Sequence, residues 1–132
     1  MRSTRWAAVV ASVLVLLAIG CRGPEPVYNV STTPVVTSKP ASLDEVQRAI
    51  QRAAIATGWQ TIPRGPGNLE GITTWATHRA VVDIKFDTKT FSITYKDSDN
   101  LNYDGTKIHP FYNTKIQDFD KAIRRELNLI GL

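Results

Sequence analysis

The chain contains one cysteine and has no apolar run long enough to cross a bilayer comfortably. Cys21 is that cysteine, so no disulfide can form within the chain and the fold must rest on its hydrophobic core. The longest apolar stretch, residues 6–19, is shorter than the about 20 apolar residues that a transmembrane helix needs. Internal repeats and coiled-coil heptads are also absent. These absences exclude a disulfide scaffold, a repeat protein and a long coiled coil.

The first 21 residues have the features of a bacterial export signal. A basic start precedes the apolar stretch, and the small residue Gly20 stands immediately before Cys21. Residues 17–21 look like the lipobox of bacterial lipoproteins, which are cut before the cysteine and acylated on it. Ala18 holds the place where leucine is more usual. We therefore predict that residues 1–20 are a signal peptide and that Cys21 is lipidated and can be labelled with palmitate.

Removal of this signal peptide would leave a nearly neutral protein. The whole chain has 16 basic and 12 acidic residues, and two of the basic ones precede Cys21, so the mature chain has 14 against 12, a net charge of +2. This balance argues against nucleic acid as a partner. The expected partner is the membrane, through acyl chains on Cys21. Arg22, not Asp, follows Cys21, which by analogy with lipoprotein sorting favours the outer membrane, facing the periplasm.

Residues 21–41 are expected to be the lipidated cysteine and a tether. This segment holds four prolines and many Ser and Thr residues, and proline-rich chain is extended and semi-rigid. Residues 27–30 are an exception, because this short β-favouring run could add an edge strand to the domain. Residues 42–132 are the predicted globular domain, which is large enough for one small core.

Two amphipathic helices are predicted at the two ends of this domain. Ser42 and Glu45 fit a capping box at the start of the first helix, and Gly58 is a natural terminator. Pro110 suits the first position of the second helix. The apolar stripe of that helix consists of Tyr112, Ile116, Phe119, Ile123 and Leu127.

The β-favouring runs between the helices predict an antiparallel meander. Residues 59–62 and 91–95 are expected strands, and residues 69–86 form a longer run whose apolar positions switch from odd to even numbers. Because side chains alternate across a strand, this switch indicates a bulge, a bend or a break. Residues 76–79 lack the Gly, Asn or Asp of a tight hairpin, so we expect one long bulged strand or two nearly collinear ones. Trp75 would then lie opposite the later apolar face and be exposed.

The order of these elements predicts the fold class. A helix, an antiparallel β-meander and a second helix are expected to give an α+β fold. The expected arrangement is a two-layer sandwich with the N-terminal and C-terminal helices on one face of the sheet, because each apolar face must be buried against another element.

The most unusual segment lies between the last strand and the last helix. It reads Tyr-x-Asp-Ser-x-Asn-Leu-x-Tyr over residues 95–103 and Ile-His-x-x-Tyr-Asn over residues 108–113. The segment resembles a family of small, largely uncharacterised bacterial lipoproteins with this pattern and a terminal helix, and the resemblance covers roughly residues 42–127 and the signal. Lys115 departs from it, since an aromatic residue is often found there. The resemblance implies an envelope lipoprotein with no secure biochemical activity. The candidate binding or loop-structuring residues are Asp97, Ser98, Asn100, Tyr103, His109, Tyr112, Asn113 and, upstream, His78.

The composition of this segment favours a structural loop. Asp, Ser and Asn side chains bond nearby backbone N–H groups and hold irregular loops in shape. Asp104 and Gly105 form a turn signal, and Leu101 would plug the loop into the core. His109, immediately before Pro110, would sit at the N-cap of the last helix.

Two chemical alternatives remain open at this stage. His78, His109 and Asp97 are a workable metal-ligand set, although their spacing gives no local signature. An EF-hand is excluded because apolar residues replace two of its ligands. Ser98 with His109 and Asp97 could act as a hydrolase, although Ser98 lacks the Gly-x-Ser-x-Gly elbow.

Recognition is the third functional reading of this sequence. Tyr95, Tyr103 and Tyr112, together with Trp59 and Trp75, could bind a glycan or an envelope protein if they form an exposed patch. We therefore expect a membrane-anchored envelope lipoprotein with a small non-enzymatic binding or structural domain, without cofactor or metal. The alternative is a small periplasmic hydrolase or metal-dependent enzyme that uses Ser98, His109 and Asp97.

Overall fold

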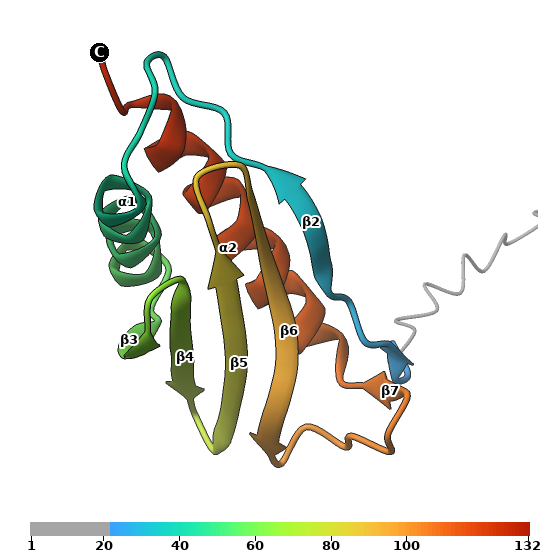
Figure 1. The fold of residues 1–132 in the computed structure, drawn as a ribbon. Helices are drawn as coiled ribbons and strands as arrows, with labels where there is room; N and C mark the ends of the chain where they lie inside the picture. Colours follow the sequence, from blue (N-terminus) through green and yellow to red (C-terminus); the bar gives the residue numbers. More distant parts are fainter. Residues whose placement is uncertain (1–21) are drawn as a thin grey trace, which may run out of the picture.

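A computed structural model describes residues 22–132, so the predicted signal peptide and Cys21 lie outside the described residues. The described residues form a five-stranded antiparallel sheet with two helices, which contact each other and one face of the sheet (Figure 1). The predicted α+β class is confirmed. In chain order the elements are β1 (Glu25–Pro26), β2 (Val30–Pro34), α1 (Leu43–Ala56), β3 (Gln60–Gly65), β4 (Asn68–Trp75), β5 (His78–Phe86), β6 (Thr90–Asp99), β7 (Lys107–Ile108) and α2 (Pro110–Asn128).

The sheet is a meander with one strand added from the N-terminal segment. Its order is β2-β6-β5-β4-β3, and every neighbouring pair is antiparallel. β3 to β6 follow one another through short turns, whereas β2 pairs with the outer edge of β6. β1 lies apart from this sheet and pairs with β7 in a two-stranded ribbon.

Both helices begin as the sequence predicted. Ser42 caps α1 through a complete capping box with Glu45, and Pro110 occupies the first turn of α2. An ion pair between Arg52 and Glu126 joins the two helices, with 2.8 Å between Nε and Oε2. The predicted stripe of α2 is confirmed, because its five side chains, Tyr112, Ile116, Phe119, Ile123 and Leu127, are all buried.

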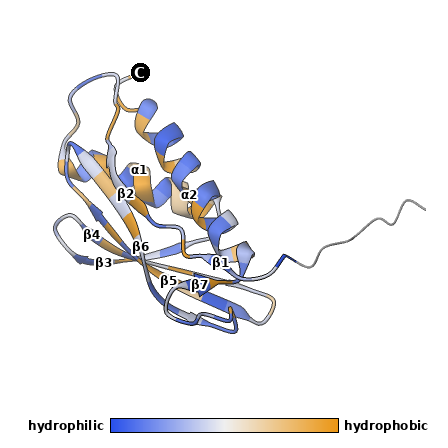
Figure 2. Ribbon diagram, turned by 90° about the vertical axis from the view of Figure 1, so that its right-hand side faces the viewer, coloured by the Kyte–Doolittle hydropathy of each residue, from blue (hydrophilic) through white to orange (hydrophobic). Residues whose placement is uncertain are grey.

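The hydrophobic core fills the space between the helices and the sheet. Trp59, which is almost fully buried, stacks on Phe119 of α2 with 5.4 Å between ring centroids. Small alanines on α1, among them Ala49 and Ala53, are fully buried. Figure 2 shows the outer side of α2 as mostly hydrophilic, whereas hydrophobic colour lies toward the sheet. The core therefore belongs to one face of the sheet.

A tight β4–β5 hairpin stands where the sequence predicted a long bulged strand. Trp75 pairs with His78, so only Ala76 and Thr77 make the reversal. A two-residue turn places the odd positions of β4 beside the even positions of β5, which explains the parity switch. The prediction was wrong because Ala76 adopts a φ of 49°, a conformation that Gly, Asn or Asp usually supplies. Trp75 was predicted to be exposed, but it is partly buried and packs against the core.

Much of the expected tether is part of the folded domain. β1 and β2 both lie within residues 21–41, and the edge strand foreseen at residues 27–30 begins only at Val30. The composition misled because Pro26 and Pro34 sit in edge strands, where the missing N–H of proline is tolerated. Among the described residues, only residues 22–24 precede β1.

A bulge in β6 decides which face each polar residue of that strand occupies. Val82 pairs with Tyr95 and Val81 with Asp97, so Lys96 has no partner on β5. Ser98 pairs with Ala80 and therefore faces the helices, whereas Asp97 faces away from them. We call the side of the sheet that neither α1 nor α2 covers the open face.

Candidate functional site

The segment singled out by the sequence forms one end of the molecule. Residues 95–113 comprise the end of β6, an irregular loop, β7 and the first turn of α2. Figure 1 shows these elements at the same end of the sheet as the β4–β5 hairpin. We call this the hairpin end, and the end with the β3–β4 and β5–β6 turns the opposite end.

Three tyrosines of the motif pack together. The ring centroids of Tyr95 and Tyr103 are 4.1 Å apart, and Tyr112 meets Tyr95 edge-on at 5.6 Å. Burial raises the pKa of both Tyr95 and Tyr112. The Tyr112 hydroxyl has no hydrogen-bond partner within residues 22–132. Tyr103 is 41% exposed and covers the edge of the cluster. Leu101 is buried in the hydrophobic core, as the sequence predicted.

Asn100 and Asp104 hold the loop in shape. Asn100 contacts two residues at the β4–β5 hairpin, and the side chain of Asp104 bonds the nearby backbone. Asn100 has a φ of 57°, its carbonyl oxygen lies 2.6 Å from His78 Nδ1, and its Nδ2 donates to Thr77 Oγ1. The Asp104 carboxylate accepts from the backbone N–H groups of Lys107 and Thr106. The bond from the Lys107 N–H is the main reason why the pKa of Asp104 is lowered. These contacts support the structural interpretation of the loop.

Asn113 fixes the N-terminal segment to α2. Its Nδ2 donates to the carbonyl oxygen of Pro26 at 2.9 Å, and its Oδ1 accepts from the backbone N–H of Tyr28 at 2.9 Å. The side chain is buried. A second asparagine acts similarly, because Asn29 Oδ1 accepts the N–H of Tyr95 beside the bulge. Sequence reasoning did not foresee that Asn113 binds a segment more than 80 positions away.

His109 caps α2 as predicted, and it belongs to a row of rings. Its Nδ1 accepts from the backbone N–H of Phe111, and the two rings stack with centroids 5.1 Å apart. His78 lies 6.0 Å from His109 and 5.4 Å from Trp75. Lys115 Nζ lies 4.9 Å from the centre of the Trp75 ring. We call Trp75, His78, His109 and Phe111 the ring row. At position 115 the sequence resemblance leads us to expect an aromatic residue. Lys115 stands there and contacts the aromatic ring of Trp75.

The proposed catalytic and metal groups do not come together. Asp97 binds Arg79 on the open face, while the Ser98 hydroxyl lies 2.8 Å from the Tyr95 hydroxyl on the helix side. No hydrogen bond joins Ser98 to His109 in residues 22–132. Within the same described residues, no three His, Cys, Asp or Glu side chains are grouped as metal ligands would be. The arrangement lacks the geometry that a Ser–His–Asp site needs.

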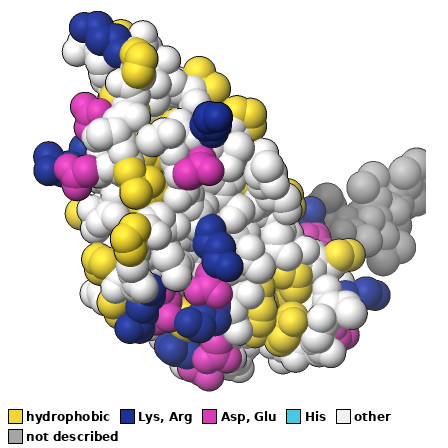
Figure 3. Space-filling model, viewed as in Figure 1, with side chains coloured by type: hydrophobic (Ala, Val, Ile, Leu, Met, Phe, Trp, Pro, Cys, Tyr) yellow, Lys and Arg dark blue, Asp and Glu magenta, His cyan; other side chains and the backbone are white. Residues whose placement is uncertain are grey.

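Charged side chains on the open face form a network that sequence reasoning missed. Glu70 is buried and accepts from Arg64 at 2.9 Å and from Lys96 at 2.7 Å. These hydrogen bonds, that of Lys96 foremost, lower the pKa of Glu70 to about 2. Lys96 also lies 3.7 Å from Asp83, and Arg79 bridges Asp97 and Asp99. Figure 3 shows basic and acidic side chains interspersed over the lower part of this face.

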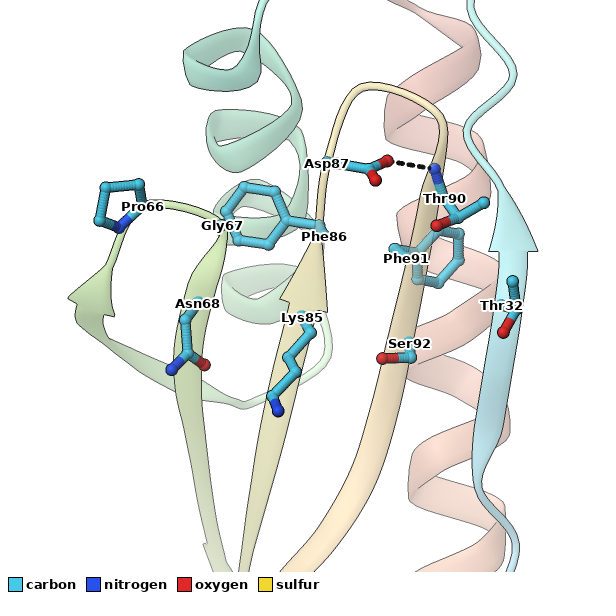
Figure 4. A pocket seen from close by; sticks show the side chains of 10 residues that line it. All are labelled: Thr32, Pro66, Gly67, Asn68, Lys85, Phe86, Asp87, Thr90, Phe91 and Ser92. Atoms are coloured by element: carbon cyan, nitrogen blue, oxygen red, sulfur yellow. Dashed lines mark hydrogen bonds between the residues drawn. The ribbon is translucent and has the colours of Figure 1, made fainter.

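A polar pocket of about 400 Å³ lies at the opposite end (Figure 4). Asn68 pairs with Lys85 and Lys85 with Ser92, so the three side chains form a row across β4, β5 and β6. Asn68 Oδ1 is buried and accepts no hydrogen bond from the part of the chain that the structure describes. Only the strand register, which the sequence did not reveal, brings these residues together. The lining comprises Thr32, Pro66, Gly67, Asn68, Lys85, Phe86, Asp87, Thr90, Phe91 and Ser92.

Two turns give this pocket its rim. Gly67 has a φ of 69°, and a Cβ at this position would lie 2.5 Å from the Phe86 carbonyl oxygen. The Asp87 carboxylate accepts from the backbone N–H groups of Thr90 and Lys89, each at 2.7 Å. These bonds lower the pKa of Asp87, that of Thr90 foremost. The rim is therefore held by the backbone conformation at Gly67 and by the hydrogen bonds of the Asp87 side chain.

Comparisons of the chain with protein-family models, with curated proteins and with solved structures found no match. The resemblance to uncharacterised bacterial lipoproteins stays a prediction from the motif residues.

Proposed function

We propose that this protein is a lipid-anchored bacterial envelope lipoprotein whose small domain is a non-enzymatic binding module. The observation that carries the anchor is the sequence over residues 17–21, which ends in the only cysteine of the chain. Within residues 22–132, no helix is both long enough and apolar enough to cross a membrane. We assign attachment to acyl chains on Cys21, and Arg22 after it favours the outer membrane, facing the periplasm.

The structural roles of the motif residues support a module without catalysis. Ser98, His109 and Asp97, the groups of the enzymatic alternative, bind three different neighbours: Tyr95, the backbone of Phe111, and Arg79. Each is thereby occupied in holding the fold. No observation on the described residues favours the hydrolase or the metal-dependent enzyme.

The polar pocket at the opposite end is the recognition surface that we assign to this module. Its volume is within the range of small-ligand sites. An amine, an amide and hydroxyl groups line it, and the Asn68 Oδ1 atom accepts no hydrogen bond from residues 22–132. An envelope glycan supplies hydroxyl and amide donors to such a surface. Of the two partner classes expected from the sequence, the pocket favours the glycan.

The anchor is tested by Cys21→Ser in the full chain. We expect palmitate labelling to disappear and the protein to leave the membrane fraction. Ser31→Cys in the same background is the matched control, because it restores an exposed thiol at a position that no lipobox precedes; labelling must not return. Continued labelling of Cys21→Ser would overturn the proposal. Arg22→Asp is expected to shift the protein toward the inner membrane.

A further inference from the structure

The described chain enters the folded domain at the hairpin end. Glu25 pairs with Ile108, and Pro26 with Lys107, immediately before α2 begins. Asn113 binds both Pro26 and Tyr28 from the first turns of α2. The entering segment is therefore fixed beside the N-terminus of α2, as Figures 1 and 2 show for β1 and β7.

The free chain between a lipidated Cys21 and this fixed point is short. Three residues, Arg22 to Pro24, separate Cys21 from Glu25. Fully extended, four residue steps reach about 14 Å at most. The headgroup layer on each side of a bilayer is roughly 5–8 Å thick. An anchor of this length keeps the hairpin end next to the lipid headgroups, and it does not let the domain stand well away from the membrane.

The surface beside this entry point carries exposed aromatic side chains. Phe111 is 60% exposed, Tyr103 is 41% exposed and Tyr28 is 39% exposed. Aromatic side chains of this kind favour the boundary between headgroups and hydrocarbon. Charges of both signs lie there, since Arg22 is 3.6 Å from Glu25, and the loop carries both Asp104 and Lys107. The contact is therefore expected to depend on the aromatic rings more than on net charge.

We infer that the hairpin end is a lipid-contact surface in which Phe111 and Tyr103 rest in the headgroup layer. This inference rests on the proposed acylation of Cys21. It assigns the domain a fixed orientation, with the N-terminus of α2 toward the membrane and its C-terminus away from it. The polar pocket, at the opposite end of the sheet, then faces the periplasm, where a glycan can reach it.

Two single-cysteine reporters, one in the first turn of α2 and one at its C-cap, test this orientation. The full-length lipidated protein is reconstituted into phosphatidylethanolamine–phosphatidylglycerol vesicles. Phe111→Cys and Leu129→Cys are each labelled with bimane, since an acylated Cys21 cannot react. Both positions are apolar and exposed, and they lie about 27 Å apart along the helix axis. Doxyl-labelled lipid is expected to quench the label at 111 at least threefold more than the label at 129.

The outcomes separate this inference from the proposed function. Flotation of the same vesicles shows whether the protein is anchored, and a protein that does not float overturns the anchor itself. Equal quenching at the two positions in a protein that floats would overturn the orientation alone. Tyr103→Cys is the second reporter at the hairpin end, used with the same Leu129→Cys control if Phe111→Cys does not fold.

Discussion

The side-chain amide of Asn113 holds the backbone of Pro26 at 2.9 Å, and it joins two segments that are 87 positions apart. A buried amide that both donates and accepts is costly to remove, because its partners are left without hydrogen bonds. Together with the pairing of β1 with β7 and of β2 with β6, this contact holds residues 25–34 on the domain although their composition indicates a tether. Asn113 also holds Pro26 next to Glu25, the residue from which the length of the link to Cys21 is counted.

Asn113→Ala is expected to lower the free energy of unfolding by about 1–3 kcal/mol, since it leaves the Pro26 carbonyl and the Tyr28 N–H unpaired in a partly buried place. Denaturant unfolding measures this loss. Hydrogen exchange should speed up mainly in residues 25–34. Gln117→Ala, on the exposed side of the same helix, is the control and should change stability by less than about 0.5 kcal/mol. Unchanged exchange in residues 25–34 would show that other contacts hold the segment.

Glu70 makes the free energy of unfolding of the domain depend on pH in the acidic range. Its pKa in the folded protein is about 2, below the ordinary value of 4.5. A lowered pKa contributes stability that is present above pH 4.5 and is lost as the pH falls toward 2. Glu70→Gln should therefore flatten the fall in melting temperature over this range. Asp44→Asn, which removes an exposed carboxylate paired with Arg48, should keep the wild-type profile. A Glu70→Gln profile that follows the wild type would refute the role of the network.

The β4–β5 turn is strained at Ala76. Because its φ is positive, Ala76→Gly should stabilise the protein by up to about 1 kcal/mol. Gly67→Ala should do the opposite, by roughly 1–3 kcal/mol, since the added Cβ would meet the Phe86 carbonyl oxygen. Thermal unfolding of both variants checks the pair. A destabilised Ala76→Gly variant would contradict the two-residue turn.

Much of the fold followed from local sequence signals, and the exceptions have physical causes. The caps at Ser42 and His109 and the buried stripe of α2 depend on neighbouring residues, so the sequence predicted them correctly. The β4–β5 hairpin was missed because Ala76 takes a conformation that its side chain disfavours. The position of β2 depends on β6, a partner about 60 residues later, which no local pattern reveals.

The candidate site was only partly predictable for the same reason. The motif residues stand out in the sequence, and the bonds of Asp104 and His109 to nearby backbone agree with the structural interpretation. Asn100 instead contacts His78 and Thr77, which lie 22 and 23 positions away. The polar pocket depends instead on the register that sets Asn68, Lys85 and Ser92 side by side. Register is a property of paired strands, so it cannot be read from the local sequence of one strand.

Lys85→Ala should weaken binding of the full-length protein to isolated cell-wall glycan, because it removes the amine from the pocket lining. We expect a loss of about tenfold or more in affinity, which corresponds to one hydrogen bond to a charged group. Lys89→Ala removes the same charge from a turn residue that does not line the pocket and should bind as the wild type does. Equal weakening by both variants would point to a general charge effect and reject the pocket.

The mass of the mature protein isolated from bacterial membranes tests the proposed lipid anchor. We expect a chain that begins at Cys21, has lost residues 1–20, and carries acyl groups on that first residue. A chain that retains residues 1–20, or one with a free thiol at Cys21, would contradict the anchor and with it the orientation of the domain.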